Sequence, residues 1–128
     1  MSAENVDVVR VAYEAFGRGD LATVAEHFAE DAEWETSDSL PLGGLVRGRE
    51  AIIGNFTQLP NYWSSFSVVP GEFIDAGDHV VVTGVQHATG PGGSFDARFL
   101  HLFTLSGGKV VRGEFIGDSA KARDALGS

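Results

Sequence analysis

Residues 97–105, the run ARFLHLFTL, constrain the fold more than any other stretch, because apolar side chains occur in both of its alternating registers. This pattern predicts a strand that is buried on both faces. Successive side chains point to opposite sides of a strand, so Phe99, His101 and Phe103 share one face. Leu100 lies on the other face. The sequence therefore predicts a titratable imidazole in an apolar wall, which is its clearest indication of a functional site.

Strands are predicted throughout the second half of the chain, where the apolar period changes from that of a helix to that of a strand after residue 62. The predicted strands are 64–69, continuing as 72–75 after a bulge at Pro70-Gly71, then 79–89, 95–105 and 109–116. The connections between them are short and rich in glycine. Because short turns join antiparallel neighbours, these strands form an antiparallel meander.

Three helices are predicted before the meander, from apolar residues at spacings of three and four. Asp20 caps the second helix, and Pro60 ends the third. The expected elements are helices at 2–18, 21–29 and 48–59, a strand at 32–36, a loop from 37 to 46 and a tail helix at 118–126.

This order of elements predicts an α+β fold, in which three N-terminal helices pack on one face of a curved, mostly antiparallel β-sheet. A strongly bent sheet around helices encloses an apolar cone. The outer face, which carries Leu100 and Leu102, stays bare unless a second copy of the chain covers it. We therefore expect a homodimer through the outer sheet face.

The composition indicates one domain over residues 1–128, since 43% of the residues are hydrophobic and 21% are charged. The net charge of −9 repels phosphate backbones and anionic lipids, so we expect neither nucleic acid nor a membrane as partner. The chain contains no cysteine, which excludes disulfides and thiolate chemistry. It shows no apolar run long enough to cross a bilayer and no signal-peptide pattern, so we expect a cytoplasmic protein.

Four segments together carry a resemblance to a known family. They are 17–20 (GRGD), 28–34 (FAEDAEW), 46–52 (VRGREAI) and 101–109, followed by Asp118. In this order and spacing they resemble the SnoaL-like polyketide cyclases of the ketosteroid isomerase/NTF2-like superfamily. The resemblance covers nearly the whole chain and implies the cone-shaped NTF2-like fold. That superfamily includes isomerases, cyclases, epoxide hydrolases, dehydratases and non-catalytic binding or dimerisation modules.

The resemblance also bears on individual site residues. It assigns the pocket histidine of the cyclases to His101, whereas their acid/base aspartate corresponds to Phe115. The base and the hydrogen-bonding acid of the steroid isomerases correspond to Thr36 and Leu100, and their helix tyrosine falls one residue before Tyr13. The resemblance therefore implies the fold and the pocket, but not the acid/base groups of the named relatives.

Two residues are candidates for catalysis. His101 is either a general acid/base, kept neutral near neutral pH by its apolar surroundings, or a core histidine bonded to a backbone carbonyl or a water. Asp38 follows Trp34 in a loop at the expected mouth of the cone, where a carboxylate facing an imidazole would complete an acid/base pair. The alternative for Asp38 is a solvated aspartate that stabilises a turn.

Aromatic residues are candidates for the lining of a cavity that binds a small apolar molecule, since such cavities are mostly apolar. They are Tyr13, Trp34, Phe56, Trp63, Phe99, Phe103 and Phe115. Each of them, taken singly, fits an ordinary core position better, because large aromatic residues are usually part of the core. No metal and no cofactor are expected, because the spacing of His27, Glu30 and Asp31 is common on an acidic surface.

The leading functional hypothesis is a cofactor-independent isomerase or cyclase acting on an apolar carbonyl compound. His101 and either Asp38 or an ordered water would carry the protons. The alternative is a non-catalytic ligand-binding or dimerisation module, which a packed interior would favour. Epoxide hydrolysis by Asp96 and Arg98 ranks last, because these side chains are expected to face away from His101.

Overall fold

A computed structural model describes residues 2–127, which form one six-stranded sheet and four α-helices. The strands are β1 (Phe28–Thr36), β2 (Gly44–Arg47), β3 (Ser65–Ala76), β4 (His79–Gly90), β5 (Gly93–Ser106) and β6 (Lys109–Ile116). The helices are α1 (Ser2–Gly17), α2 (Leu21–Glu26), α3 (Arg49–Thr57) and α4 (Ser119–Leu126), with a 3-10 turn at Leu59–Asn61. None of these helices is long and apolar enough to span a membrane.

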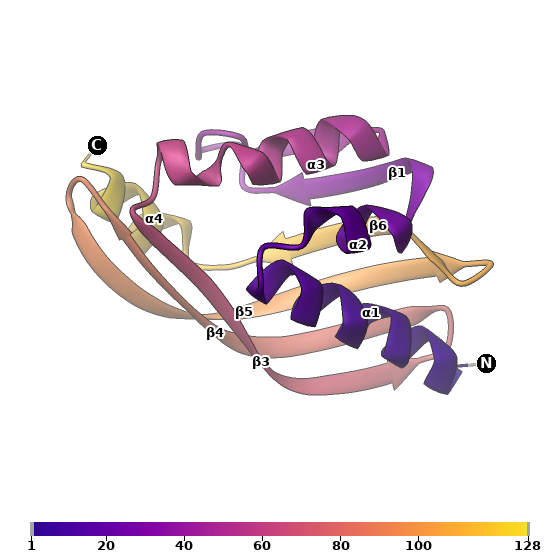
Figure 1. Ribbon diagram of the computed structural model, residues 1–128. Coiled ribbons are helices and arrows are strands. Elements are labelled where there is room, and N and C mark those ends of the chain that lie inside the picture. The colour runs from indigo at the N-terminus through magenta and orange to yellow at the C-terminus, as the bar shows by residue number, and fades with distance from the viewer. Residues whose placement is uncertain (1, 128) are drawn as a thin grey trace.

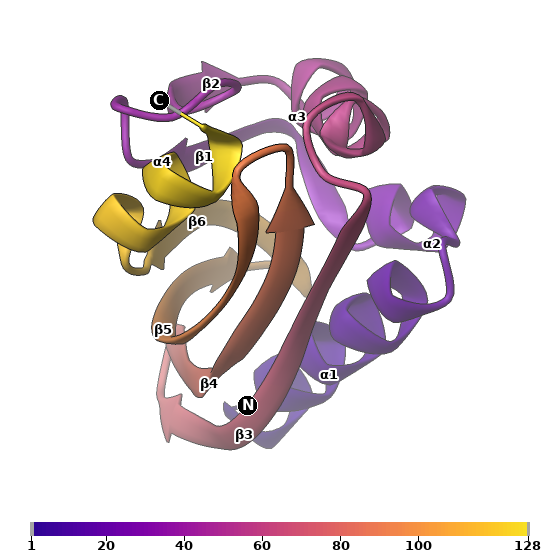
Figure 2. The ribbon, with the colours of Figure 1, turned by 90° about the vertical axis from the view of Figure 1, so that its left-hand side faces the viewer.

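The sheet is strongly curved, and its strand order is β2-β1-β6-β5-β4-β3 (Figure 1). Helices α1, α2 and α3 lie on its concave side, while α4 lies at the end where β4 turns into β5 (Figures 1 and 2). All neighbouring strands are antiparallel except β1 and β6, which are parallel. The predicted α+β class, with helices on a curved and mostly antiparallel sheet, is confirmed.

The first two helices are separated by a tight turn that the sequence predicted. Gly19 has a φ of +74°, a backbone conformation that glycine adopts without steric cost. The carboxylate of Asp20 then accepts a hydrogen bond from the backbone N–H of Thr23, at 3.1 Å, and so caps α2. The prediction that α2 continues to residue 29 is wrong, since the helix ends at Glu26.

Two strands differ from their predicted positions. β1 begins at Phe28 instead of residue 32, because Phe28 pairs in parallel with Val110 of β6, ahead of a register shift before residues 33–35. Residues 44–46 were expected to belong to a loop, but Gly44–Arg47 pairs with β1 as the edge strand β2. Both pairings join segments that are distant in sequence or very short, so the local apolar period gives no sign of them.

The meander of β3 to β6 agrees with the sequence-based prediction, including the register irregularity between Pro70 and Glu72. In this register His101 lies opposite Val82 on β4 and Phe115 on β6. The imidazole is therefore on the central strand of the meander, with a neighbouring strand on each side.

Glycines on the concave face allow two large rings to lie against the sheet. A Cβ at Gly84 would lie 2.5 Å from Cζ of Phe99, and a Cβ at Gly113 would lie 2.5 Å from Cε3 of Trp34. Any larger residue at either position would push these rings toward the helices. The absence of side chains at Gly84 and Gly113 thus helps to keep space between sheet and helices.

Candidate functional site

A cavity of about 190 Å³ lies between the concave face of the sheet and the helices. The residues that line it come from all four helices, the 3-10 turn, the loop before β2, and strands β1 and β3 to β6. Most of the lining is apolar. Pro41 and Gly117 belong to the lining and are also exposed, so the cavity opens to the surface near the loop before β2 and the start of α4.

Most of the aromatic residues predicted to line a cavity do so. Those in the lining are Tyr13, Trp34, Phe56, Trp63, Phe103 and Phe115. Phe99 is not among the lining residues. It is 3% exposed, stacks on Phe115 with ring centroids 5.1 Å apart and belongs to the core of the concave face.

His101 lies in the wall of this cavity and is 5% exposed. Its Nδ1 is 2.6 Å from the hydroxyl oxygen of Tyr13 on α1. The ring centroid lies 4.1 Å from that of Phe103 and 4.8 Å from that of Trp34, which is perpendicular to it. The partner of Nδ1 is thus a side chain from a different element, which neither sequence-based interpretation of His101 included.

Burial keeps both partners of this hydrogen bond uncharged. Because the imidazole is desolvated, the pKa of His101 is lowered to about 3. Desolvation likewise raises the pKa of the Tyr13 hydroxyl above its ordinary value of 10.0. At neutral pH the pair is therefore a neutral phenol bonded to a neutral imidazole.

The Nε2 atom of His101 is buried and has no hydrogen-bond partner among residues 2–127. If the Tyr13 hydroxyl donates to Nδ1, a single group, the Nε2–H, is left unsatisfied. If Nδ1–H donates instead, both the hydroxyl hydrogen and the Nε2 lone pair lack a partner. Since each buried unsatisfied polar group costs about 1–3 kcal/mol, the first arrangement is favoured. His101, a lining residue, thus carries an N–H donor at Nε2 that has no partner among residues 2–127.

The carboxylates of the described residues lie away from this imidazole. Asp38 is exposed and is not part of the cavity lining, although its neighbour Ser37 is. Asp118 is the one acidic residue among the lining positions of the described chain, and it is exposed and caps α4 by accepting from the backbone N–H of Lys121. The structure does not bring Asp38 and His101 together as the sequence-based hypothesis supposed.

Gln86 is a polar lining residue that the sequence analysis missed. It lies on β4 and is 7% exposed. Its position is two residues before the buried Ala88 and four after the buried Val82, so it shares their face of the strand. Strand parity could have identified it, since a glutamine in the register of buried apolar residues is unusual.

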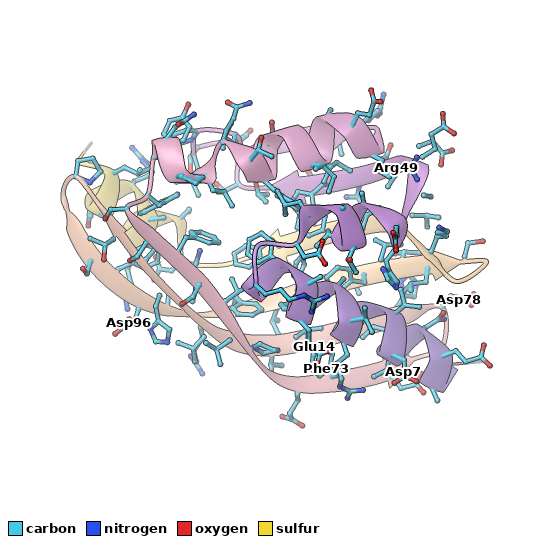
Figure 3. The ribbon with its side chains drawn as sticks, viewed as in Figure 1. Asp7, Glu14, Arg49, Phe73, Asp78 and Asp96 are labelled. Atoms are coloured by element: carbon cyan, nitrogen blue, oxygen red, sulfur yellow. The ribbon has the colours of Figure 1, made fainter. Side chains whose placement is uncertain are left out.

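Asp96 and Arg98 lie on the opposite side of the sheet, as expected. Asp96 is exposed and bonds to His87, at 2.5 Å between Oδ1 and Nδ1, and Figure 3 shows it on the side of the sheet away from the helices. This position does not fit epoxide hydrolysis in the cavity. Among residues 2–127 there is also no group of three His, Asp or Glu side chains placed to hold a metal ion.

Comparison with known proteins agrees with this architecture. Residues 9–113 match the family model of the SnoaL-like domain. A solved NTF2-like protein of unknown function from Burkholderia pseudomallei superimposes with a TM-score of 0.91 and 30% identity, covering 98% of both chains. TerC, co-crystallized with polyporic acid, gives a TM-score of 0.90 and 27% identity, covering 98% of this chain and 99% of its own. An uncharacterized protein of Mycobacterium tuberculosis is 29% identical over 119 residues, 91% of each chain. The NTF2-like fold is thus confirmed.

The buried imidazole predicts a pH dependence of stability. The unfolded chain binds a proton at His101 near the ordinary pKa of 6.5, whereas the folded chain does so only at about 3. Below about pH 6.5 the unfolded state therefore holds more protons, and the free energy of unfolding decreases as pH falls, by at most about 1.4 kcal/mol per pH unit. Urea unfolding of wild type and His101→Gln between about pH 4 and pH 7 measures this contribution. The free energy of unfolding should change less steeply with pH in the variant than in wild type. Equal pH dependence in the two proteins would contradict burial of a neutral imidazole.

Proposed function

Since the chain belongs to the SnoaL-like domain family, we propose that its cavity binds a small, largely apolar carbonyl compound and shifts protons on it without a cofactor. His101 is the proposed proton donor at the carbonyl oxygen, and Tyr13 holds its ring in position. The reaction class is an isomerisation or a cyclisation that passes through an enol or enolate. The alternative is a ligand-binding or dimerisation module that catalyses no reaction.

The observation that carries this proposal is the unpartnered Nε2 of His101 in a cavity wall. A carbonyl oxygen of a bound compound would accept a hydrogen bond from the Nε2–H. As a proton leaves the neighbouring carbon, negative charge develops on that oxygen. A donor held in apolar surroundings stabilises such charge more strongly than water does. Tyr13 fixes the ring tautomer and its orientation through Nδ1.

A second proton carrier must remove the hydrogen from carbon, and the two candidates remain Asp38 and a water molecule. The position of Asp38 outside the cavity lining favours a water entering from the mouth. The polar side chains of Thr36, Asn55 and Ser119 lie in the lining and offer such a water hydrogen-bonding groups.

The aromatic lining residues form the proposed substrate-binding surface. Trp34, Phe103 and Phe115 lie closest around His101, so a ring of the substrate would pack against them. The structurally similar TerC was co-crystallized with polyporic acid, which supports a small molecule as the ligand. An unfilled interior also speaks against the dimerisation module, for which a packed interior would suffice.

We further propose that the outer face of the sheet joins two copies of the chain in a homodimer. Large apolar side chains are exposed on four neighbouring strands: Val69 is 51%, Val85 37%, Leu100 46% and Ile116 53% exposed. They adjoin one another, because Val69 pairs with Val85 and Leu100 pairs with Ile116. Patches of this kind are typical of protein–protein contacts.

A cytoplasmic location remains part of the proposal.

The proposed chemistry predicts that the protein accelerates exchange of the α-hydrogens of 2-tetralone for deuterium in D2O, followed by NMR. Replacing His101 by Phe removes the donor to the carbonyl oxygen and should slow the catalysed exchange by roughly 100-fold, the usual contribution of a positioned acid/base group. His79→Phe is the matched control, since His79 is exposed and is not part of the cavity lining. The Asp38→Asn variant should keep the wild-type rate if water is the second carrier. A His101→Phe variant as fast as wild type would refute the role of His101.

The dimer proposal predicts a mass of twice the 13.6 kDa of the chain in light scattering. Leu100→Glu places a charge in the centre of the proposed contact and should give a monomer. Leu45→Glu, at 45% exposure on the edge strand β2, is the matched control and should stay dimeric. A monomeric wild type would rule the dimer out.

A further inference from the structure

Gln86 is a second polar group that the cavity leaves unsatisfied. The residue is 7% exposed and lies in the cavity lining, on the same face of β4 as the fully buried Val80 and Val82. Its side-chain amide forms no hydrogen bond with any of residues 2–127, although it offers two donors and an acceptor. Unlike Nε2 of His101, neither polar atom of this amide is fully buried, so the amide reaches the open space of the cavity, where a ligand could bond to it.

The neighbours of Gln86 leave its amide free to meet a ligand. Ala97 lies directly opposite it on β5 and is too small to cover it. The amide oxygen lies near Gly117, where a Cβ would be 3.7 Å from Oε1. Gly117 is exposed and belongs to the lining, so the amide is close to the open end of the cavity.

The register of β4 and β5 places Gln86 and His101 toward opposite ends of the cavity. Gln86 pairs with Ala97, while His101 pairs with Val82, four residues away along the strands. At about 3.3 Å per residue this separates the two positions by ~13 Å along the sheet, and the concave curvature brings the side-chain ends closer together. Phe115 lines the cavity and contacts His101, at 5.2 Å between ring centroids. The wall between the two polar groups is thus aromatic.

We propose that Gln86 is a second anchor of the ligand, so that the natural ligand carries one hydrogen-bonding group for His101, an apolar ring-containing body, and a second hydrogen-bonding group for the amide of Gln86. The inference rests on the proposed function, because it takes the cavity to be a ligand site. It narrows the substrate class to compounds with oxygen or nitrogen functions at both ends. Gln86 then determines specificity, and His101 acts on the carbonyl.

Two matched pairs of probes test this proposal: 2-naphthol with naphthalene-2,6-diol, and 4-hydroxybiphenyl with biphenyl-4,4'-diol. Isothermal titration gives the ratio of the two dissociation constants within each pair. In the wild type the second hydroxyl should tighten binding roughly fivefold or more in at least one pair, as expected for one added hydrogen bond to a buried group. In Gln86→Met, which keeps the length of the side chain but removes its polar atoms, this gain should fall to about the twofold factor that the symmetry of a diol provides, while the affinity for the mono-ol stays.

Gln58→Met is the matched control, since Gln58 is exposed and is not part of the cavity lining, and it should keep the wild-type gain. The melting temperature of Gln86→Met should stay close to that of wild type, because the amide forms no hydrogen bond with residues 2–127 that the substitution could break. Three results would overturn the role of Gln86. The affinity gain from the second hydroxyl could persist in Gln86→Met, or wild type could show no such gain in either pair of probes. The third is a clear drop in the melting temperature of Gln86→Met. Failure of every probe to bind would instead overturn the proposed function.

Discussion

The hydrogen bond between Tyr13 and His101 is the interaction on which the site depends. It joins the first helix to the central strand of the meander and satisfies Nδ1 of the imidazole inside an aromatic wall. Because it uses one ring nitrogen, it leaves the other, Nε2, without a partner among residues 2–127. Two neutral groups suffice for this arrangement, so the protein needs no buried charge to hold the ring in place.

The curvature of the sheet makes this arrangement possible. Gly84 and Gly113 let the rings of Phe99 and Trp34 lie against the strands, and the helices then rest on the remaining side chains without filling the space between. The cost is an interior that is less than fully packed and that contains an unpaired N–H and an unpaired amide. Such a cost is typical of a binding site, where the ligand provides the missing contacts.

Sequence reasoning identified the parts of the molecule that depend on local pattern. The alternation in residues 97–105 placed His101 on the concave face, and the glycine turns gave the antiparallel meander. It failed where distant pairing decides: β1 starts early because it pairs with β6, and β2 exists because it pairs with β1. The sequence also did not predict that the hydroxyl of Tyr13 bonds to Nδ1 of His101, since 88 residues separate the two.

The positions of Phe99 and Asp38 depend on contacts that the sequence does not show. Phe99 was expected in the lining but packs into the core over Gly84, and Asp38 was expected to face His101 but is exposed. A residue that faces inward, or that lies at the cavity mouth, reaches the cavity only if no other side chain covers it. The apolar period of the sequence does not show which side chains lie opposite each other. The inward orientation of Gln86, by contrast, could have been predicted from the sequence, because Gln86 alternates in register with the buried Val82 and Ala88.

The most direct test of this account is the ¹⁵N NMR spectrum of the His101 ring before and after addition of 2-tetralone. The account predicts a neutral ring that carries its hydrogen on Nε2, and a shift of the Nε2 resonance on binding while Nδ1, held by Tyr13, changes little. A ring that is protonated at neutral pH, or one whose Nε2 resonance does not respond to a ketone that binds, would contradict it.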